Sequence, residues 1–284
     1  MSPYIYILGT VQDGGFPHAG CKKNCCKDAF TNPNLSKKVS SIAIVDPSSK
    51  QQWIIDASPD FKDQYHTLQK QTKSEIISGI LLTHAHIGHY LGLAQLGKEV
   101  MDCNNINVFA MEKMSSFLKK NGPWSQLVTN NNISLIKIKS DLEFELNNKI
   151  LITPILVPHR EDYSETVCFI IKSQKKKVIF IPDIDKWHLW DRDIIKIIYE
   201  VDYALIDGTF YNNKELGRGM SKIPHPFVEE SMNLFKDLSA KEKSKIYFTH
   251  LNHTNPLLIE NSFEQKKVRK NGFNIAKEGL ILEL

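Results

Sequence analysis

Three histidines lie within six residues of one another and offer the clearest chemistry in this sequence. His84, His86 and His89 follow the apolar run 80–83 in the pattern His-x-His-x-x-His. With 10 histidines in 284 residues, random placement would produce this spacing about 0.01 times per chain. Imidazole nitrogens are common ligands of Zn²⁺. We interpret the motif as a metal site at the end of a buried strand, rather than as a group of hydrogen-bonded loop histidines.

Three later apolar runs end in residues that could complete such a site. These residues are His159, Asp183 and His250. Each has an ordinary alternative: either histidine could lie at the edge of the core, and Asp183 could cap the helix that follows it. Their occurrence in order at the ends of strand-like runs favours one site assembled from several strands.

A second group of potential ligands lies near the N-terminus. Cys21, Cys25 and Cys26 follow a glycine-rich stretch, and they are three of only five cysteines in the chain. An odd cysteine count and an adjacent pair do not suggest a disulfide framework. Metal binding explains the cluster better, although one or two of these residues could be ordinary buried thiols.

The remaining sequence alternates between short apolar runs and amphipathic stretches, which predicts sheets covered by helices. Expected strands are Tyr4–Leu8, Ser41–Val45, Trp53–Asp56, Gly79–Thr83, Asn107–Ala110, Ile133–Ile138, Lys149–Leu156, Thr166–Ile171, Val178–Ile181, Tyr203–Asp207, Lys245–Thr249 and Leu280–Leu284. Expected helices are Asp60–Lys70, His89–Met101, Trp187–Val201 and Pro226–Leu238. The proposed ligands span most of the chain, so we expect a single domain over residues 1–284 in the α/β class.

Composition excludes several classes of protein. Hydrophobic residues make up 42% of the chain and charged residues 24%, as in ordinary globular proteins. The net charge of +4 is mild and gives little reason to expect a nucleic-acid partner. No apolar run is long enough to cross a membrane. The N-terminus shows no signal-peptide pattern, so we expect a cytoplasmic protein, although a chain that had lost its signal peptide would look the same.

The histidine motif resembles the signature His-x-His-x-Asp-His of the metallo-β-lactamase fold superfamily. The resemblance implies an αββα sandwich of two mixed sheets flanked by helices. It also implies that His84, His86 and His159 hold a first metal ion. His89, His250 and a bridging Asp183 would hold a second.

The sequence departs from this signature at one position. Gly88 stands where the superfamily usually has an aspartate that binds the second metal. We therefore expect a weaker second site, or replacement of the missing ligand by His253 or by water. On this reasoning, Gly88→Asp should raise the metal content.

Other motifs resemble a narrower group within the superfamily, the pyrroloquinoline quinone biosynthesis proteins and the phosphonate-pathway cyclic phosphodiesterases. Residues 249–256, Thr-His-Leu-Asn-His-Thr-Asn-Pro, and the Asp-Gly-Thr-Phe at residues 207–210 carry this likeness. The group implies a structural zinc in the Cys-rich loop at about 14–30. The resemblance makes Cys21, Cys25, Cys26 and the distant His225 its ligands.

These features predict a zinc-dependent hydrolase that attacks a phosphodiester or related ester with hydroxide generated at the metal. We expect one or two catalytic ions and one structural zinc, with iron or manganese as alternatives at the catalytic site. Asp183 would bridge the ions. Asp56 would orient a ligand histidine or lie in a plain surface turn. His253 and His188 are candidate proton donors, although His188 could equally be an exposed surface histidine.

Three other functions remain open. The same pocket could hold iron and activate O₂, the fold could serve as a non-catalytic metal-containing binding protein, or the chain could process RNA. We expect a small-molecule substrate, and a homodimer is compatible with the sequence.

Overall fold

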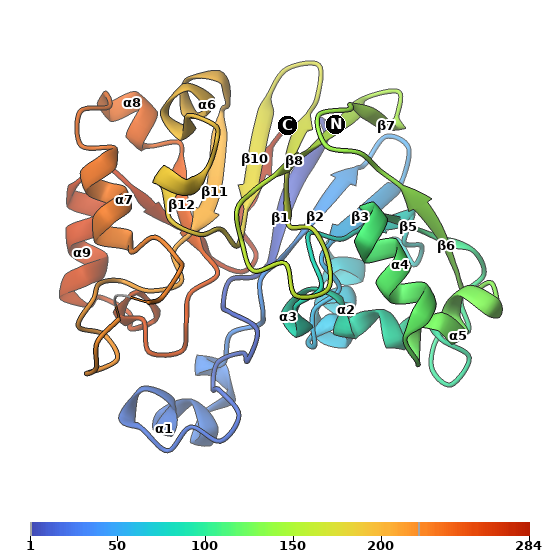
Figure 1. The fold of residues 1–284 in the computed structure, drawn as a ribbon, viewed down its shortest axis with the longest axis horizontal. Helices are drawn as coiled ribbons and strands as arrows, with labels where there is room; N and C mark the ends of the chain where they lie inside the picture. The colour runs from blue at the N-terminus through green and yellow to red at the C-terminus, as the bar shows by residue number, and fades with distance from the viewer. Residues whose placement is uncertain (1, 221) are drawn as a thin grey trace.

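Two seven-stranded sheets lie face to face in the computed structural model, and helices cover their outer faces (Figure 1). The structure describes residues 2–220 and 222–284. The order of strands is β14-β1-β2-β3-β4-β5-β6 in the first sheet and β13-β12-β11-β10-β9-β8-β7 in the second. This is the expected αββα sandwich, and the predicted fold class is confirmed.

The first sheet and its helices are built mainly from the N-terminal half of the chain. Its strands are β1 (Tyr4–Gly9), β2 (Ser41–Asp46), β3 (Gln51–Ile55), β4 (Gly79–Leu81), β5 (Ile106–Ala110), β6 (Ile133–Lys137) and β14 (Ile281–Glu283). The helices of this half are α1 (Asn24–Thr31), α2 (Phe61–Thr72), α3 (Ile87–Tyr90), α4 (Glu112–Lys120) and α5 (Trp124–Thr129). Two short 3₁₀ turns accompany them, η1 (Pro33–Leu35) and η2 (Leu91–Leu96).

The second sheet comes from the C-terminal half. Its strands are β7 (Phe144–Asn147), β8 (Ile150–Leu156), β9 (Val167–Lys172), β10 (Lys177–Ile181), β11 (Tyr203–Asp207), β12 (Ile246–Thr249) and β13 (Asn274–Ile275). Its helices are α6 (Ile194–Glu200), α7 (Val228–Leu234), α8 (Ala240–Lys243) and α9 (Phe263–Lys270), with 3₁₀ turns η3 (Trp187–Leu189) and η4 (Pro256–Leu258).

The direction of the strands decides where loops meet. In the first sheet β1, β3 and β4 run the same way, because β2 is antiparallel to both β1 and β3 and because β3 is parallel to β4. In the second sheet β8, β10, β11 and β12 share a direction for the same reason. Each set therefore ends at one edge of its sheet, which is where loops of α/β proteins gather functional residues.

All twelve expected strands are present, with bounds that shift by a few residues, but three of the expected helices are shorter than predicted. The stretch 226–238 is helical only over α7, Val228–Leu234. The stretch 89–101 begins with the four-residue α3 and continues as η2. There Gly92 donates its N–H to the Ala57 carbonyl, and a Cβ on Gly92 would lie 2.2 Å from the Ser58 carbonyl oxygen. The stretch 187–201 forms two separate elements, η3 and α6. Asp193 is the N-cap of α6, because its carboxylate accepts hydrogen bonds from two backbone N–H groups of that helix.

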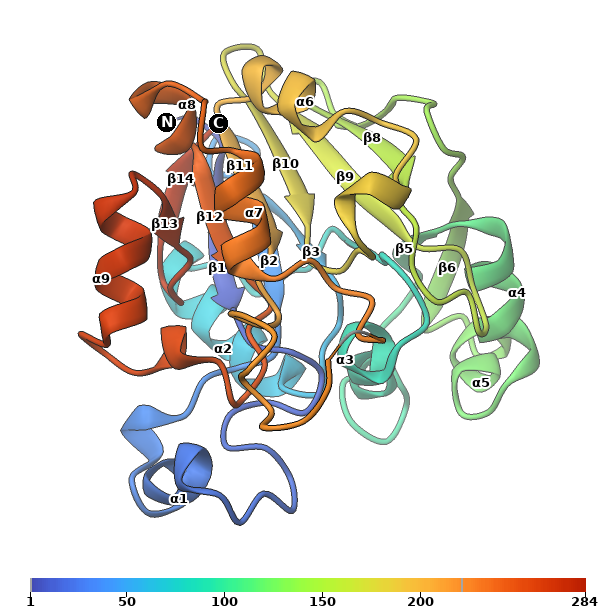
Figure 2. The same cartoon turned by 60° about the vertical axis from the view of Figure 1, so that its left-hand side comes forward.

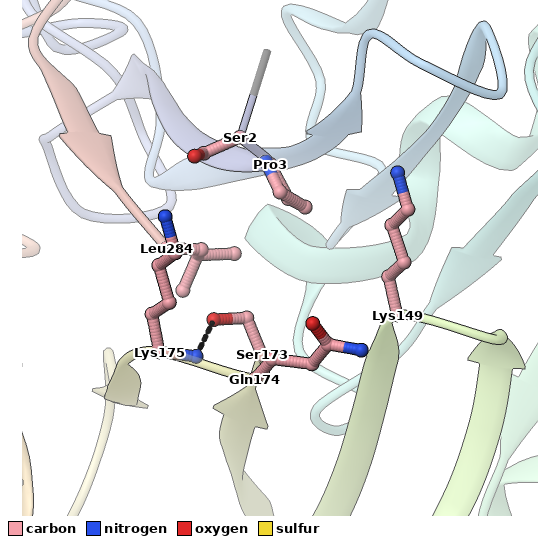
Figure 3. A pocket seen from close by; sticks show the side chains of 7 residues that line it. All are labelled: Ser2, Pro3, Lys149, Ser173, Gln174, Lys175 and Leu284. Carbon is pink, nitrogen blue, oxygen red and sulfur yellow. Dashed lines mark hydrogen bonds between the residues drawn. The ribbon is translucent and has the colours of Figure 1, made fainter.

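Figure 2 shows the sandwich turned so that α7 and α9 come forward, and α1 again lies beyond one end of the sheets. The start of β1 and the end of β14 pair at the opposite end. A hollow of about 310 Å³ lies there, lined by residues that include Pro3, Lys149 and Leu284 (Figure 3). No helix in the described part of the chain is both long and apolar enough to span a membrane.

The layer between the sheets holds a core of buried aliphatic and aromatic side chains from both sheets. Phe169 on β9 belongs to this core and is fully buried, whereas Phe263 at the start of α9 is 75% exposed. Removing a buried phenyl ring costs transfer free energy and leaves a cavity.

We expect Phe169→Ala to lower the free energy of unfolding by about 3–5 kcal/mol, because the substitution removes a fully buried ring and leaves a cavity in the core. Urea unfolding followed by tryptophan fluorescence measures the change. The matched control Phe263→Ala should stay within about 0.5 kcal/mol of the parent. Equal effects of the two substitutions would contradict the assignment of the core.

Candidate metal centre

The loops that follow the like-directed strands meet at one edge of the sandwich and bring together most of the predicted site residues. His84 follows β4, His159 follows β8, Asp183 follows β10 and His250 follows β12. Among the described residues, three groups of side chains here have the composition of metal-ion sites. They are His84, His86, His159 with Asp183; Asp13, His89 with His250; and His225 with Asp183 and Asp207.

The first group matches the expected first metal position. The Asp183 Oδ2 lies 3.2 Å from His159 Nε2 and 3.4 Å from His84 Nε2. His86 takes part through its other nitrogen, Nδ1, which lies 3.3 Å from His159 Nε2. Ligands bonded at about 2.1 Å to one tetrahedral ion would lie about 3.4 Å apart. The observed separations fit that arrangement.

The second group lies beside the first. His89 Nε2 is 3.4 Å and His250 Nε2 is 3.9 Å from the Asp13 Oδ1. The Asp183 Oδ2 is also 4.0 Å from His250 Nε2. One carboxylate oxygen of Asp183 therefore faces both groups, in the bridging place that the sequence resemblance implied.

These groups carry buried polar atoms that find no partner within the described protein. Five such atoms converge here: His84 Nε2, His89 Nε2, His250 Nε2, Asp13 Oδ1 and Asp183 Oδ1. An unpaired buried polar atom costs roughly 1–3 kcal/mol, and more when it is charged. Lone pairs that point at a common space are what a divalent cation satisfies. The donor set of imidazoles and carboxylates therefore fits a metal cofactor.

The Nδ1 atoms of these histidines form hydrogen bonds on the side of the ring away from the shared space, and these bonds fix the orientation of the rings. Near β3 and β4, the Asp56 Oδ2 accepts the His89 Nδ1–H at 2.7 Å, and Thr83 Oγ1 lies 3.0 Å from His84 Nδ1. Thr83 donates its hydroxyl to Asp56. Each bond places the ring proton on Nδ1, which leaves the Nε2 lone pair free for a metal. Asp56 is fully buried, so it orients ligands and does not lie in a surface turn.

The second sheet repeats this arrangement. Thr209 Oγ1 lies 2.9 Å from His250 Nδ1 and donates to the Asp207 carboxylate at 2.7 Å. The Asp185 Oδ1 lies 2.9 Å from His159 Nδ1. Four histidine rings, those of His84, His89, His159 and His250, are thus oriented by a carboxylate or hydroxyl that contacts Nδ1.

Burial and charge set the protonation of these rings. Burial lowers the pKa of His84 and of His250, which favours the neutral imidazole that binds metals. Burial opposes charge on His89 as well, but Asp56 and Asp13 outweigh it and raise its pKa to about 10. A metal ion at this position must therefore displace a proton from His89.

Two site residues have left-handed backbone conformations that non-glycine residues rarely adopt. Asp56, directly after β3, has φ of 67°, and His250, directly after β12, has φ of 58°. Such conformations cost of order 1–3 kcal/mol and tend to persist at functional sites. Here they occur where the chain leaves a strand and turns a side chain toward the metal centre.

The cysteines form a separate site near α1, and their fourth neighbour is not the predicted one. Cys21, Cys25, Cys26 and His253 have ligand atoms within 4.8 Å of one another. The His253 Nδ1 lies 3.3 Å from Cys26 Sγ, and the Cys21 and Cys25 sulfurs are 3.8 Å apart. Thiolates bonded at about 2.3 Å to a tetrahedral zinc would be about 3.8 Å apart. Burial and the neighbouring thiols raise the pKa of Cys26 to about 12, so three thiolates need a cation to share this space.

His225 and His253 have thus exchanged their predicted places. His225 lies beside the histidine ligand groups, with Nδ1 2.8 Å from Asp207 Oδ2 and 3.2 Å from Asp183 Oδ1. His253 contacts the cysteines and lies outside the other ligand groups of the described residues. The sequence could not distinguish them, because both histidines lie in loops near prolines and chain direction decides which site each faces. His188 is exposed and belongs to neither set of ligands among the described residues.

Three carboxylates of the centre, Asp13, Asp207 and the Asp185 that contacts His159, were not predicted from the sequence. Asp13 lies in the loop after β1, and Asp207 ends β11. Asp207 was part of a recognised motif but received no role. For Asp13 the only signal was its place after a strand, in a glycine-rich loop that drew attention to the cysteines.

The chain is similar in sequence to known proteins over most of its length. A family model described as the Beta-lactamase superfamily domain matches residues 52–251. Coenzyme PQQ synthesis protein B of Acinetobacter baumannii (strain ACICU) is 26% identical over 99% of this chain and 100% of its own length.

Two solved structures share the fold. Zinc-bound PqqB from Methylobacterium extorquens superposes with a TM-score of 0.84 at 24% identity, covering 99% of this chain and 100% of that one. A diphosphatase of the PhnP family superposes with a TM-score of 0.68 at 19% identity, covering 100% and 98%.

The exchange of the two histidines can be tested with Co²⁺, whose bonds to thiolates absorb in the near ultraviolet. We expect His253→Ala to weaken this absorption and to lower the affinity of the Cys site. His225→Ala should leave the absorption unchanged, because its ring lies among carboxylates and imidazoles. Loss of the thiolate band in His225→Ala but not in His253→Ala would restore the original assignment.

Proposed function

The chain belongs to the beta-lactamase superfamily, in its metallo-β-lactamase form, and we propose that it is a metal-dependent hydrolase of a phosphodiester or a related ester. The observation that carries the proposal is the pair of ligand groups that share the Asp183 carboxylate. Two adjacent ions are the arrangement that many phosphoryl-transfer hydrolases use.

His84, His86 and His159 would hold one ion, His89 and His250 the other, and Asp183 would contact both. Bound divalent ions would supply a nucleophile at neutral pH, by lowering the pKa of water from about 15.7 toward about 7, and would polarise the ester. We propose zinc for these positions and for the Cys site, because imidazole and thiolate suit zinc.

His225 is the proposed proton donor to the leaving group, in place of His253. Burial disfavours its charged form, but Asp207 and Asp183 outweigh burial and raise its pKa to about 9. At neutral pH the ring therefore carries a proton, as a general acid must. Asp207 holds the ring by accepting from its Nδ1.

An anionic substrate has a complementary group at the rim. Arg160, exposed on the loop after β8, has a guanidinium nitrogen 3.4 Å from His86 Nε2. A guanidinium binds phosphate oxygens by paired hydrogen bonds. Its place beside a metal ligand supports a small phosphate-containing substrate. The solved structure of the PhnP family is named as a diphosphatase, which also favours a phosphate-containing substrate.

A second candidate function rests on the likeness to PQQ synthesis protein B over nearly the whole chain. In that case the same histidines would hold iron and the protein would consume O₂. Metal analysis and an oxygen electrode separate the two proposals, because the hydrolase needs no O₂.

We expect the zinc-loaded protein to hydrolyse bis-p-nitrophenyl phosphate. In His84→Ala we expect kcat/KM to fall by at least about 100-fold, because one proposed ligand of the first metal position is lost. Release of p-nitrophenol measures the rate, and His188→Ala is the matched control because that ring is exposed. Equal activity in His84→Ala and the parent would argue for a binding protein.

The role of His225 predicts a dependence on the leaving group. His225→Ala should slow an alkyl phosphodiester by about 10²–10⁴-fold but should affect a p-nitrophenyl ester far less, because p-nitrophenolate leaves without a proton. Asp207→Asn should show the same pattern more weakly. An equal loss on both substrates would indicate a structural role for the ring.

A further inference from the structure

We propose that Asp13 supplies, from the loop after β1, the second-metal carboxylate that the superfamily signature places at the position of Gly88. On this view the second metal position is complete in this chain. The inference rests on the metal centre of the proposed function, but it does not depend on which reaction the centre performs.

The space around Gly88 is the first observation. A Cβ built on Gly88 would lie 2.1 Å from the Asp13 Oδ1 and 2.7 Å from the Asp13 Cα. No side chain fits at such distances without moving the loop backbone. The Asp13 carboxylate thus occupies the volume into which an aspartate at position 88 would project. Glycine at 88 and aspartate at 13 depend on each other.

The second observation is the set of atoms that the Asp13 carboxylate faces. Its Oδ1 is buried, finds no hydrogen-bond partner within the described protein, and faces the Nε2 atoms of His89 and His250. Those two nitrogens are also unpaired. Three unpaired ligand atoms from three separate segments therefore surround one space.

A divalent cation fits this space better than a simple ion pair does. An ion pair between Asp13 and protonated His89 would bring the atoms to about 2.7–2.9 Å, but they lie 3.4 Å apart. His89 already has a closer carboxylate at 2.7 Å, Asp56, on its other nitrogen. The wider separation matches two ligands of a common ion, and the carboxylate adds the negative charge that Gly88 cannot provide.

The backbone holds Asp13 in place. Gln12 donates its N–H to the Leu251 carbonyl at 2.9 Å, and Leu251 donates to the Thr10 carbonyl at 2.8 Å. The loop that carries Asp13 is therefore bonded to the loop that carries His250. Both ligands approach the second metal position as one unit.

The test measures bound metal rather than turnover. It can therefore fail while the hydrolase proposal stands, and it can succeed even if the protein hydrolyses no ester. In Asp13→Asn we expect the protein, purified with zinc and dialysed, to hold one ion fewer per chain. The affinity for that ion should fall by more than about 100-fold. The Co²⁺–thiolate absorption should not change, which would show that the Cys site is intact. Asp28→Asn, an exposed aspartate in α1, is the matched control and should bind metal as the parent does.

A swapped variant sharpens the test. Gly88→Asp alone should lose metal or stability, because its carboxylate meets that of Asp13. The double variant Asp13→Gly with Gly88→Asp should regain an ion relative to Asp13→Asn. The Asp13 carboxylate is then gone, and a loop with glycine at positions 13, 14 and 15 can withdraw by the roughly 0.7 Å that brings its backbone from 2.7 Å to ordinary contact with the new Cβ.

Three results would overturn the proposal. One is a parent protein that binds a single ion besides that of the Cys site. Another is Asp13→Asn with unchanged metal affinity but lowered stability, which would identify a structural ion pair. The last is a gain of metal in Gly88→Asp while Asp13 is still present.

Discussion

The whole centre depends on one electrostatic constraint, the burial of lone pairs and carboxylate charges that point at a shared space. Nitrogens of His84, His89 and His250 and oxygens of two aspartates lie there without partners in the described protein. Inside a fold such atoms are costly, and their mutual repulsion adds to the cost. A cation removes both penalties at once. The surrounding structure therefore holds these ligand atoms in place, and a bound ion would stabilise them.

The surrounding structure uses the same device in each sheet. Asp56, after β3, accepts directly from one histidine and through Thr83 reaches a second. Asp207, at the end of β11, accepts directly from His225 and through Thr209 reaches His250. Each carboxylate is fully buried and fixes two rings. The parallel arrangement of strands brings these two aspartates to the same edge of the sandwich, so that the rings they orient face one another.

The sequence predicted the layered fold and the histidines at the strand ends, because apolar periodicity and strand-end position are local signals. The prediction was wrong where the answer depends on loop direction. His250 and His253 lie only three residues apart, yet one belongs to a group with Asp13 and His89 and the other faces the cysteines. Asp13 was missed for a related reason. Its significance lies in its close contact with Gly88, where its carboxylate takes the space of a side chain, and no spacing rule connects residues in separate loops.

The Cys site has a consequence for how the molecule is made. Its thiols leave the ribosome early in synthesis, but their partner His253 lies 227 residues beyond Cys26 and emerges near the end. For most of translation these soft ligands are therefore incomplete and open to whatever metal or oxidant they meet. The Asp13 loop is also without its bonds to Leu251 during that time. His84, His86, His159 and Asp183 all precede His250 in the sequence, so the ligands of the first metal position have been synthesised before those of the second are complete.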